Sequence, residues 1–273
     1  MTDFHGTSRE AVATLRQRVR GVTGTPAELV EAGQQLFSVV RLLDAQPVLR
    51  RALTDSTRTP DDRAALAGNL LGARIGAQAL DLVTAAVRLS WPRTRQLIDA
   101  LEEVGALVLV RASEEEGRLD DLEDALFRFA RLLEREEGLQ LALTDPRIPA
   151  ENRATLVREL LAGKAPEGAV PLVEQAVVAP RGRSLTEALD AYAKLAAGWR
   201  ERLVATVRTA TPLSAADQDR LAGALRRQYG HDVHLNILVD PGVLGGLRVE
   251  LGAEVIDGTI ASRLDDARRR LAG

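Results

Sequence analysis

Apolar residues recur every three or four positions through the first two hundred residues, the spacing of one buried face on an α-helix. Examples of this spacing are Leu29, Leu36, Val40 and Leu43. Helix starts are marked by a hydroxyl residue followed three positions later by an acid. The hydroxyl accepts from a free N–H of the first turn, and the acid lies at the positive end of the helix dipole. Such starts lie at Thr25, Thr59, Ser184 and Ser214. Residues 8 to about 200 are therefore predicted to form a run of amphipathic helices joined by short turns.

The helical part contains an internal repeat with an offset of about ninety residues. Sixteen of the 44 positions from 29 to 72 are identical to the positions ninety residues further on, where chance would give about one in ten. The clearest matches are Leu36-Phe37 with Leu126-Phe127, Ala52-Leu53-Thr54-Asp55 with Ala142-Leu143-Thr144-Asp145, and Arg63-Ala64 with Arg153-Ala154. Farther on the offset is 88, which aligns Arg93 and Arg95 with Arg181 and Arg183. The repeat predicts two helical units, residues 1–112 and 113–200.

The pattern changes at about residue 200. Two segments have the pattern of β-strands, with β-branched residues or with apolar and polar residues in alternation: 203–208 and 233–239. The capped helix from Ser214 lies between them, so the predicted order is strand, helix, strand. Residues 247–251 alternate as well, and 254–256 form a last short strand across a turn, so a hairpin is expected. A closing helix is expected after it. The predicted fold is therefore mainly α: two consecutive helical-bundle units followed by a small α/β domain, residues 201–273.

Composition and charge narrow the choice of partner. The chain is 45% hydrophobic and 27% charged, with 36 basic and 39 acidic residues and a net charge of −3. A net negative charge repels the phosphate backbone of a nucleic acid, so no nucleic-acid partner is expected. There is no cysteine, which excludes disulfides and thiolate chemistry. The longest clean apolar run, Val104 to Val110, is far short of the roughly 20 residues that a bilayer requires. We expect a soluble chain without direct membrane insertion, which reaches a membrane only through a partner.

Candidate sites for chemistry are few. His231 and His234 are the one close histidine pair, but residues three apart in a strand point to opposite faces, so no metal site is expected. The glycines of 242–246 lack the Lys-Ser/Thr and the helix start of a phosphate cradle, and favour a tight bend. The acids of 114–116 favour a solvated turn over a calcium site. The sequence therefore predicts no catalytic, cofactor or metal site.

Without a predicted site for chemistry, the function is expected to depend on the surfaces that the fold offers to other proteins. A groove between helices accepts an amphipathic partner helix, and a sheet edge accepts a strand or a helix end. Protein binding is therefore the first hypothesis. A generic helical-repeat adaptor explains the first two hundred residues equally well. An enzyme is the third hypothesis, with His231, His234 and Asp240 as its best available site.

The tail carries a specific signature. Val233 to Gly252 reads VHLNILVDPGVLGGLRVELG, and DGTIASRL follows from Asp257. This order of an aspartate, a glycine pair and an Asp-Gly-hydroxyl helix start closely resembles the C-terminal signature of the δ subunit of bacterial F-type ATP synthase. The family includes the mitochondrial oligomycin-sensitivity-conferring protein, and the resemblance covers residues 113–273 well. The signature residues are Asp240, Gly245, Gly246, Asp257, Gly258, Thr259, Arg263 and Leu264. We interpret them as determinants of the fold and not as contacts.

The resemblance implies a non-catalytic part of the peripheral stalk, or stator, which couples proton flow to ATP synthesis by resisting the torque of the rotor. In this family the helical domain holds N-terminal helices of α subunits on the catalytic head, and the C-terminal domain joins the b subunit. A peripheral position on the cytoplasmic face of the cell membrane follows, with a separate b subunit. This chain is about ninety residues longer than the usual family member, and its repeat accounts for them. Which copy holds the α helices is left open.

Overall fold

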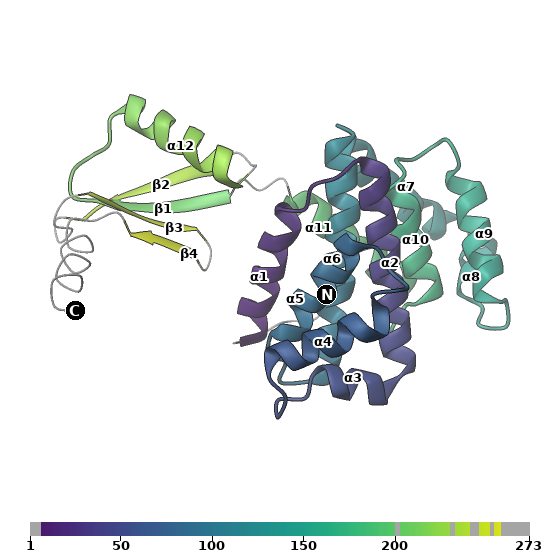
Figure 1. Cartoon of the computed structure of the whole chain (residues 1–273). Coiled ribbons are helices and arrows are strands. Elements are labelled where there is room, and N and C mark those ends of the chain that lie inside the picture. The colour runs from purple at the N-terminus through teal and green to yellow at the C-terminus, as the bar shows by residue number, and fades with distance from the viewer. Residues whose placement is uncertain (1–6, 200–202, 230–232, 241–245, 252–253, 258–273) are drawn as a thin grey trace. The chain divides into compact units, whose positions relative to one another are not determined.

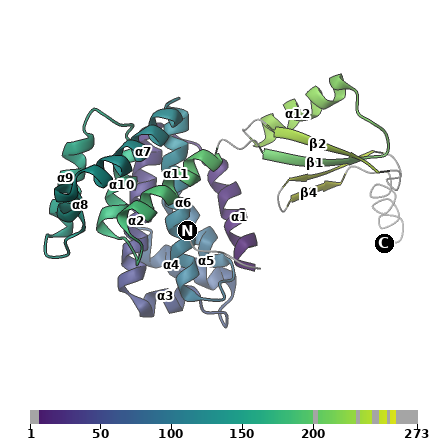
Figure 2. The same ribbon diagram turned by 180° about the vertical axis from the view of Figure 1, so that it is seen from behind.

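The computed structural model describes residues 7–199, 203–229, 233–240, 246–251 and 254–257 (Figures 1 and 2). The chain divides between Arg200 and Glu201 into two compact units. The first unit is all helical, and the second combines one described helix with a four-stranded sheet. The prediction of a mainly α protein with a small α/β tail is confirmed.

The first unit holds eleven helices among residues 7–199. They are α1 (Thr7–Arg20), α2 (Pro26–Ala45), α3 (Pro47–Leu53), α4 (Pro60–Leu71), α5 (Ala77–Arg88), α6 (Thr94–Glu115), α7 (Leu119–Arg135), α8 (Glu137–Thr144), α9 (Ala150–Leu161), α10 (Ala169–Val178) and α11 (Leu185–Trp199). The helices α2 to α6 and α7 to α11 follow each other in the same order of long and short elements, offset by about ninety residues.

The predicted helix starts are confirmed at the level of hydrogen bonds. The Thr25 hydroxyl accepts from the Glu28 N–H at 3.3 Å, while the Glu28 carboxylate accepts from the Thr25 N–H at 2.8 Å. Thr59 and Asp62 form the same reciprocal capping box at α4. The serine hydroxyls predicted at the other two starts, Ser184 and Ser214, also accept from the N–H three residues on. The acid three positions on also accepts hydrogen bonds from the cap residue. These bonds favour the charged form of the acid and so lower its pKa, as at Glu28 and Asp62.

The repeat also has a hydrogen-bonding basis. Arg63, only 4% exposed, donates to the backbone carbonyls of Asp55 and of Arg88 at the end of α5. Ninety residues on, Arg153 donates to the carbonyls of Leu143 and of Val177 near the end of α10. The last carbonyls of a helix lack partners within it, so each arginine satisfies acceptors that would otherwise be buried and unpaired. Both copies therefore use the same side chain to fix the end of the same helix.

The predicted division into two helical units at residues 112 and 113 is wrong. That boundary falls inside α6, and every residue from 100 to 110 of this helix is buried. Figures 1 and 2 show α6 in the middle of the helical unit. At the offset of ninety, residues 97–110 correspond to α1, so α6 is both the last helix of the first copy and the first helix of the second. A helix buried on all sides by both copies cannot be divided between them, and residues 11–199 share one hydrophobic core.

Two glycines allow α2 to lie close against α6. A Cβ at Gly105 of α6 would lie 3.0 Å from the ring atoms of Phe37 on α2, and a Cβ at Gly33 of α2 would lie 2.6 Å from Cγ of Leu109 on α6. Leu109 is fully buried and has no room to move away. The contact between the two helices therefore depends on the absence of side chains at these positions.

The second unit is a βαβ element extended by a hairpin. Strand β1 (Leu203–Thr209) leads through α12 (Ala215–Tyr229) to β2 (Val233–Val239), which pairs with β1 in parallel, and a crossover helix is the usual connection for such a pair. Strands β3 (Leu247–Leu251) and β4 (Glu254–Asp257) form the predicted hairpin, and the sheet order is β2-β1-β3-β4. A small separate core holds Val207, Leu225, Val233 and Val249. The expected closing helix lies outside the described residues.

The close contact of α2 with α6 gives a matched pair of glycine substitutions. We expect Gly33→Ala to destabilise the helical unit by about 1–3 kcal/mol, because the new methyl group overpacks a full core. We expect Gly68→Ala in α4, where a Cβ would meet nothing within 4 Å, to stabilise it by about 0.5–1 kcal/mol. Urea unfolding followed by circular dichroism measures both values. Equal effects of the same sign would contradict the inferred packing of α2 on α6.

Candidate partner-binding surfaces

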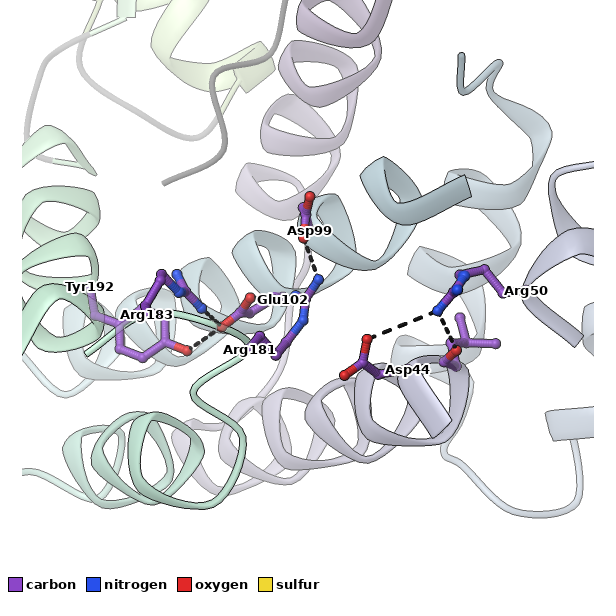
Figure 3. A network of polar contacts seen from close by, with 8 residues as sticks. Asp44, Arg50, Asp99, Glu102, Arg181, Arg183 and Tyr192 are labelled. Carbon is purple, nitrogen blue, oxygen red and sulfur yellow. Dashed lines mark hydrogen bonds and ion pairs between the residues drawn. The ribbon is translucent and has the colours of Figure 1, made fainter. Parts of the chain in front are cut away.

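A buried network of charges ties α6 to the second copy (Figure 3). The Arg181 guanidinium lies 2.6 Å from the Glu102 carboxylate and also pairs with Asp99, one turn earlier on α6. Arg183 pairs with Glu102 as well, and the Tyr192 hydroxyl donates to the same carboxylate at 2.8 Å. The side chains of Arg181 and Glu102 are 4% and 6% exposed. A network buried this deeply holds the fold together and is not open to a partner.

The backbone at Arg181 is held in an unusual conformation by this network. Its φ is 52°, in the left-handed region, and Gly182 follows with φ of 81°. A residue with a Cβ costs about 1–2 kcal/mol in that region. The ion pairs of Arg181 with Asp99 and Glu102 offset that cost and fix the turn before α11. The sequence repeat aligned Arg181 with Arg93 but gave no sign of its partners, because they lie about eighty residues away.

A second buried carboxylate faces the first copy. Glu103, with 4% of its side chain exposed, lies 2.5 Å from the Arg16 guanidinium of α1. Adjacent residues of a helix point about 100° apart, so Glu102 and Glu103 reach different neighbours. Each copy therefore contributes the arginine that neutralises one of two adjacent glutamates on α6.

An open cleft lies between α2 of the first copy and helices α9 and α10 of the second. Its volume is 390 Å³, within the range of ligand and side-chain pockets. Phe37, Pro171 and Val178 give it apolar walls, and Arg41 and Gln175 lie along it. The sequence gave no signal for this cleft, because its two sides come from different copies of the repeat.

Exposed apolar side chains mark a further surface on the second copy. Phe127 of α7 is 59% exposed and Leu141 of α8 is 66% exposed. The equivalent of Phe127 in the first copy is Phe37, which is 2% exposed and packs against Tyr192 with 6.3 Å between ring centroids. The second copy covers this face of the first, and its own equivalent face is open. Among the described residues, the exposed ring of Phe127 is stacked only by the Arg131 guanidinium, 5.2 Å from its centroid.

The signature residues fall partly within the described residues of the second unit. The Asp240 N–H donates to the Thr209 carbonyl at 2.9 Å, where β2 ends beside β1. Gly246, just before β3, has φ of 83°, a value that favours glycine, and Asp257 of β4 lies opposite Arg248. The rest lie outside the described residues: Gly245, Gly258, Thr259, Arg263 and Leu264. Their role as fold determinants stays a prediction.

Other candidate chemistry finds little support in the described part of the chain. It contains no group of three or more His, Asp or Glu residues that could hold a metal ion. His231 lies outside it, and His234 lies in β2 beside Val204 of β1. Glu114 and Glu115 pair with Arg111. Among the described helices none is long and apolar enough to cross a membrane.

A helical repeat with an open cleft and an exposed aromatic face, followed by a small α/β unit, defines a protein-binding subunit. Curated relatives share this organisation over nearly their whole length, and each is called ATP synthase subunit delta. The protein of Streptomyces avermitilis is 48% identical over 98% of both chains, and that of Acidothermus cellulolyticus is 45% identical over 98% of this chain and all of its own. The duplicated helices are therefore shared with these relatives.

The family model of the ATP synthase delta (OSCP) subunit matches residues 101–271. The chain belongs to this family, which favours the δ-subunit hypothesis over a generic adaptor. The match begins inside α6 and not at residue 113, as expected if α6 is the first helix of the second copy. A chain of the Toxoplasma gondii mitochondrial ATP synthase hexamer, solved by cryo-EM, is 25% identical and covers 62% of this chain and 95% of its own length. Its TM-score of 0.26 is too low to compare folds.

The charge on Glu102 is expected to be essential to the helical unit. Glu102→Gln leaves Arg183 without its carboxylate and the buried Arg181 with Asp99 alone, and we expect a loss of about 3 kcal/mol in the free energy of unfolding. Glu115→Gln on the same helix is the control, because the Glu115 side chain is 39% exposed and its pair with Arg111 contributes about 1 kcal/mol at most. Urea unfolding measures both. Similar losses would contradict the assignment of Glu102 to the buried network.

Tyr192 gives the helical unit a dependence on alkaline pH. Burial, and then the charge of Glu102, raise the pKa of Tyr192 well above 10. The unfolded chain releases this proton near pH 10, so stability is full below that pH and falls as the pH rises above it. We expect the urea midpoint to fall between about pH 9 and about pH 11, and to fall less in Tyr192→Phe. An equal fall in both proteins would show that other groups carry the effect.

Proposed function

We propose that this chain is a static link in the peripheral stalk of an F-type proton-transporting ATP synthase. In such a machine the rotor turns against a catalytic head. Unless an arm connects the head to the membrane sector, the head turns with the rotor and proton flow drives no synthesis. The link needs two binding surfaces and a rigid body between its contacts. It breaks and forms no covalent bond itself.

The observation that carries this proposal is the pair of separate units on one chain. The helical unit and the α/β unit have separate hydrophobic cores, joined through residues 200–202. We assign the helical unit to the catalytic head, where it holds N-terminal helices of α subunits. The open cleft beside α2 and the exposed Phe127 face support this assignment, because both suit an amphipathic helix.

The α/β unit is assigned to the b subunit. Strand β2 is an edge of the sheet, and Leu238 and Val239 at its end are 41% and 49% exposed. An edge strand with exposed apolar side chains accepts a further strand or a helix end. Attachment through α and b places the chain at the cytoplasmic face of the cell membrane as a peripheral protein.

The duplicated helices suit a part that carries load. A second helical unit tethered by a linker would yield to force, whereas two copies that share α6 deform only if a continuous core is disrupted. We infer that the extra copy lengthens a stiff contact along the head or the stalk. The shared core pattern of Leu36 and Leu126, both buried, motivates this inference.

Co-purification and severing of the chain test this function. From detergent-solubilised membranes, an affinity tag on this chain is expected to recover the α and b subunits with one fixed copy number per assembly. In stripped vesicles, the intact chain is expected to restore ATP-driven proton pumping. The same chain supplied as two unlinked pieces, 1–200 and 201–273, is expected to bind but not to restore pumping, because no force passes between the pieces.

Two results would overturn the proposal. Recovery of neither α nor b with the tagged chain would remove the assignment to the stalk. Full pumping with the severed chain would show that a continuous link between the two units is not what the chain provides. Each piece is checked for folding by circular dichroism, so that loss of pumping is not confused with loss of structure.

A further inference from the structure

The cleft between α2 and helices α9 and α10 exists because the chain is duplicated. Its first wall is α2 with Phe37 and Arg41, and its second wall is α10 with Pro171, Glu174 and Gln175. Helix α2 belongs to the first copy, and the other two helices belong to the second (Figure 1). A family member with one helical copy has no such pair of walls.

Arg41 is a cation without an anionic partner among the described residues. One of its amino groups donates to Oε1 of Gln175 at 2.9 Å, and the other donates to the Ser38 hydroxyl at 2.9 Å. No described carboxylate lies within ion-pair distance of it. The equivalent arginine of the second copy, Arg131, lies 2.8 Å from Glu134. Arg41 is exposed along the cleft, and the part of it that packs against the helices lowers the pKa of its guanidinium, against the charge of Glu174.

Gln175 brings a free donor to the same place. Its side chain is almost wholly buried, with 1% of the residue exposed. Because its oxygen accepts from Arg41, its amide orientation is fixed, and its Nε2 has no hydrogen-bond partner. A buried donor without an acceptor is unfavourable. At the offset of 88, the first copy has the fully buried Val87 in this place. The amide is therefore specific to the cleft and not a feature of the repeat.

The cleft holds two further carboxylates and one further cation, which pairs with both of them, so with Arg41 its cations and anions are equal in number. Arg158 lies 2.6 Å from Glu174 and 3.0 Å from Glu151. Glu174 also acts on Arg41 through its charge, but at no distance that makes an ion pair. One unpaired guanidinium and one unpaired amide N–H are left, and both are donors. Both suit an oxygen acceptor, and a carboxylate offers one oxygen to the guanidinium that has no close carboxylate and one to the amide.

We propose that this cleft binds an aspartate or glutamate side chain on an amphipathic helix of the α subunit, a contact that rests on the proposed function. The carboxylate lies between Arg41 and Nε2 of Gln175, and its carbon stem packs on Phe37, Pro171 and Val178. A side chain of a helix fits better than a free anion because the donors lie in a cleft with apolar walls, which a small hydrated anion does not fill.

Binding of the full-length chain to catalytic heads stripped of it tests the proposal. Arg41→Gln removes the charge, and Gln175→Glu replaces the free donor with a carboxylate that pairs with Arg41 inside the cleft. We expect each variant to bind the heads at least about tenfold more weakly. Arg18→Gln on α1 is the control, because its exposed side chain pairs with Asp81 away from the cleft and from Phe127, and it is expected to bind as the unchanged chain does. Thermal unfolding checks that Gln175→Glu, which alters a buried side chain, still folds.

The outcomes separate this inference from the function on which it rests. If the unchanged chain does not bind the heads, the proposed function fails. If it binds and both cleft variants bind equally well, this inference fails while the proposed function stands. A second arm titrates the chain with glutarate and follows the side-chain amide signal of Gln175 by NMR. Saturation by about 10 mM glutarate would show a site for free carboxylates and would overturn the assignment to a helix.

Discussion

The burial of α6 on every side is the constraint on which the helical unit depends. A helix in a bundle normally has one polar face in contact with solvent. In α6 every residue from 100 to 110 is buried, so this stretch has no such face. Two adjacent glutamates lie within this stretch, and each is neutralised by arginine from a different copy, Glu103 by Arg16 and Glu102 by Arg181 and Arg183. Removing either set of arginines would leave a carboxylate buried and unpaired. The two copies are therefore connected by electrostatics as well as by apolar packing, and neither is complete without α6.

Duplication of a helical unit produced new surfaces as well as more of the old ones. Phe37 and Phe127 are the same residue of the repeat, yet one packs in the interior against Tyr192 and the other is exposed. Arg41 and Arg131 diverge in the same way, since only Arg131 has a carboxylate partner among the described residues. A head-to-tail arrangement of two copies leaves one face of each kind uncovered. The cleft beside α2 and the open face of α7 follow from that arrangement.

The sequence predicted what depends on neighbours along the chain. The helix starts at Thr25 and Thr59, the hairpin of β3 with β4 and the helical repeat all follow from local spacing, and the structure confirms them. The division at residue 112 was wrong because a pattern of apolar positions says which face is buried but not by how many neighbours. The pairing of Glu102 with Arg181 and of Arg41 with Gln175 spans 79 and 134 residues, and no local pattern reports a contact at that range.

The two kinds of polar contact in this unit suit two different tasks. Around Glu102 each of two arginines and one tyrosine hydroxyl finds a carboxylate acceptor, with only Nε of Arg181 left without one, and such a network fixes a single arrangement of helices. In the cleft the polarity is incomplete, because Gln175 keeps an unpaired donor beside an unpaired arginine. An unsatisfied buried donor lowers the stability of the free protein and so favours whatever supplies the missing acceptor. A part that must be both stiff and attached needs both: satisfied charges at the shared helix and unsatisfied donors at the surface where a partner binds.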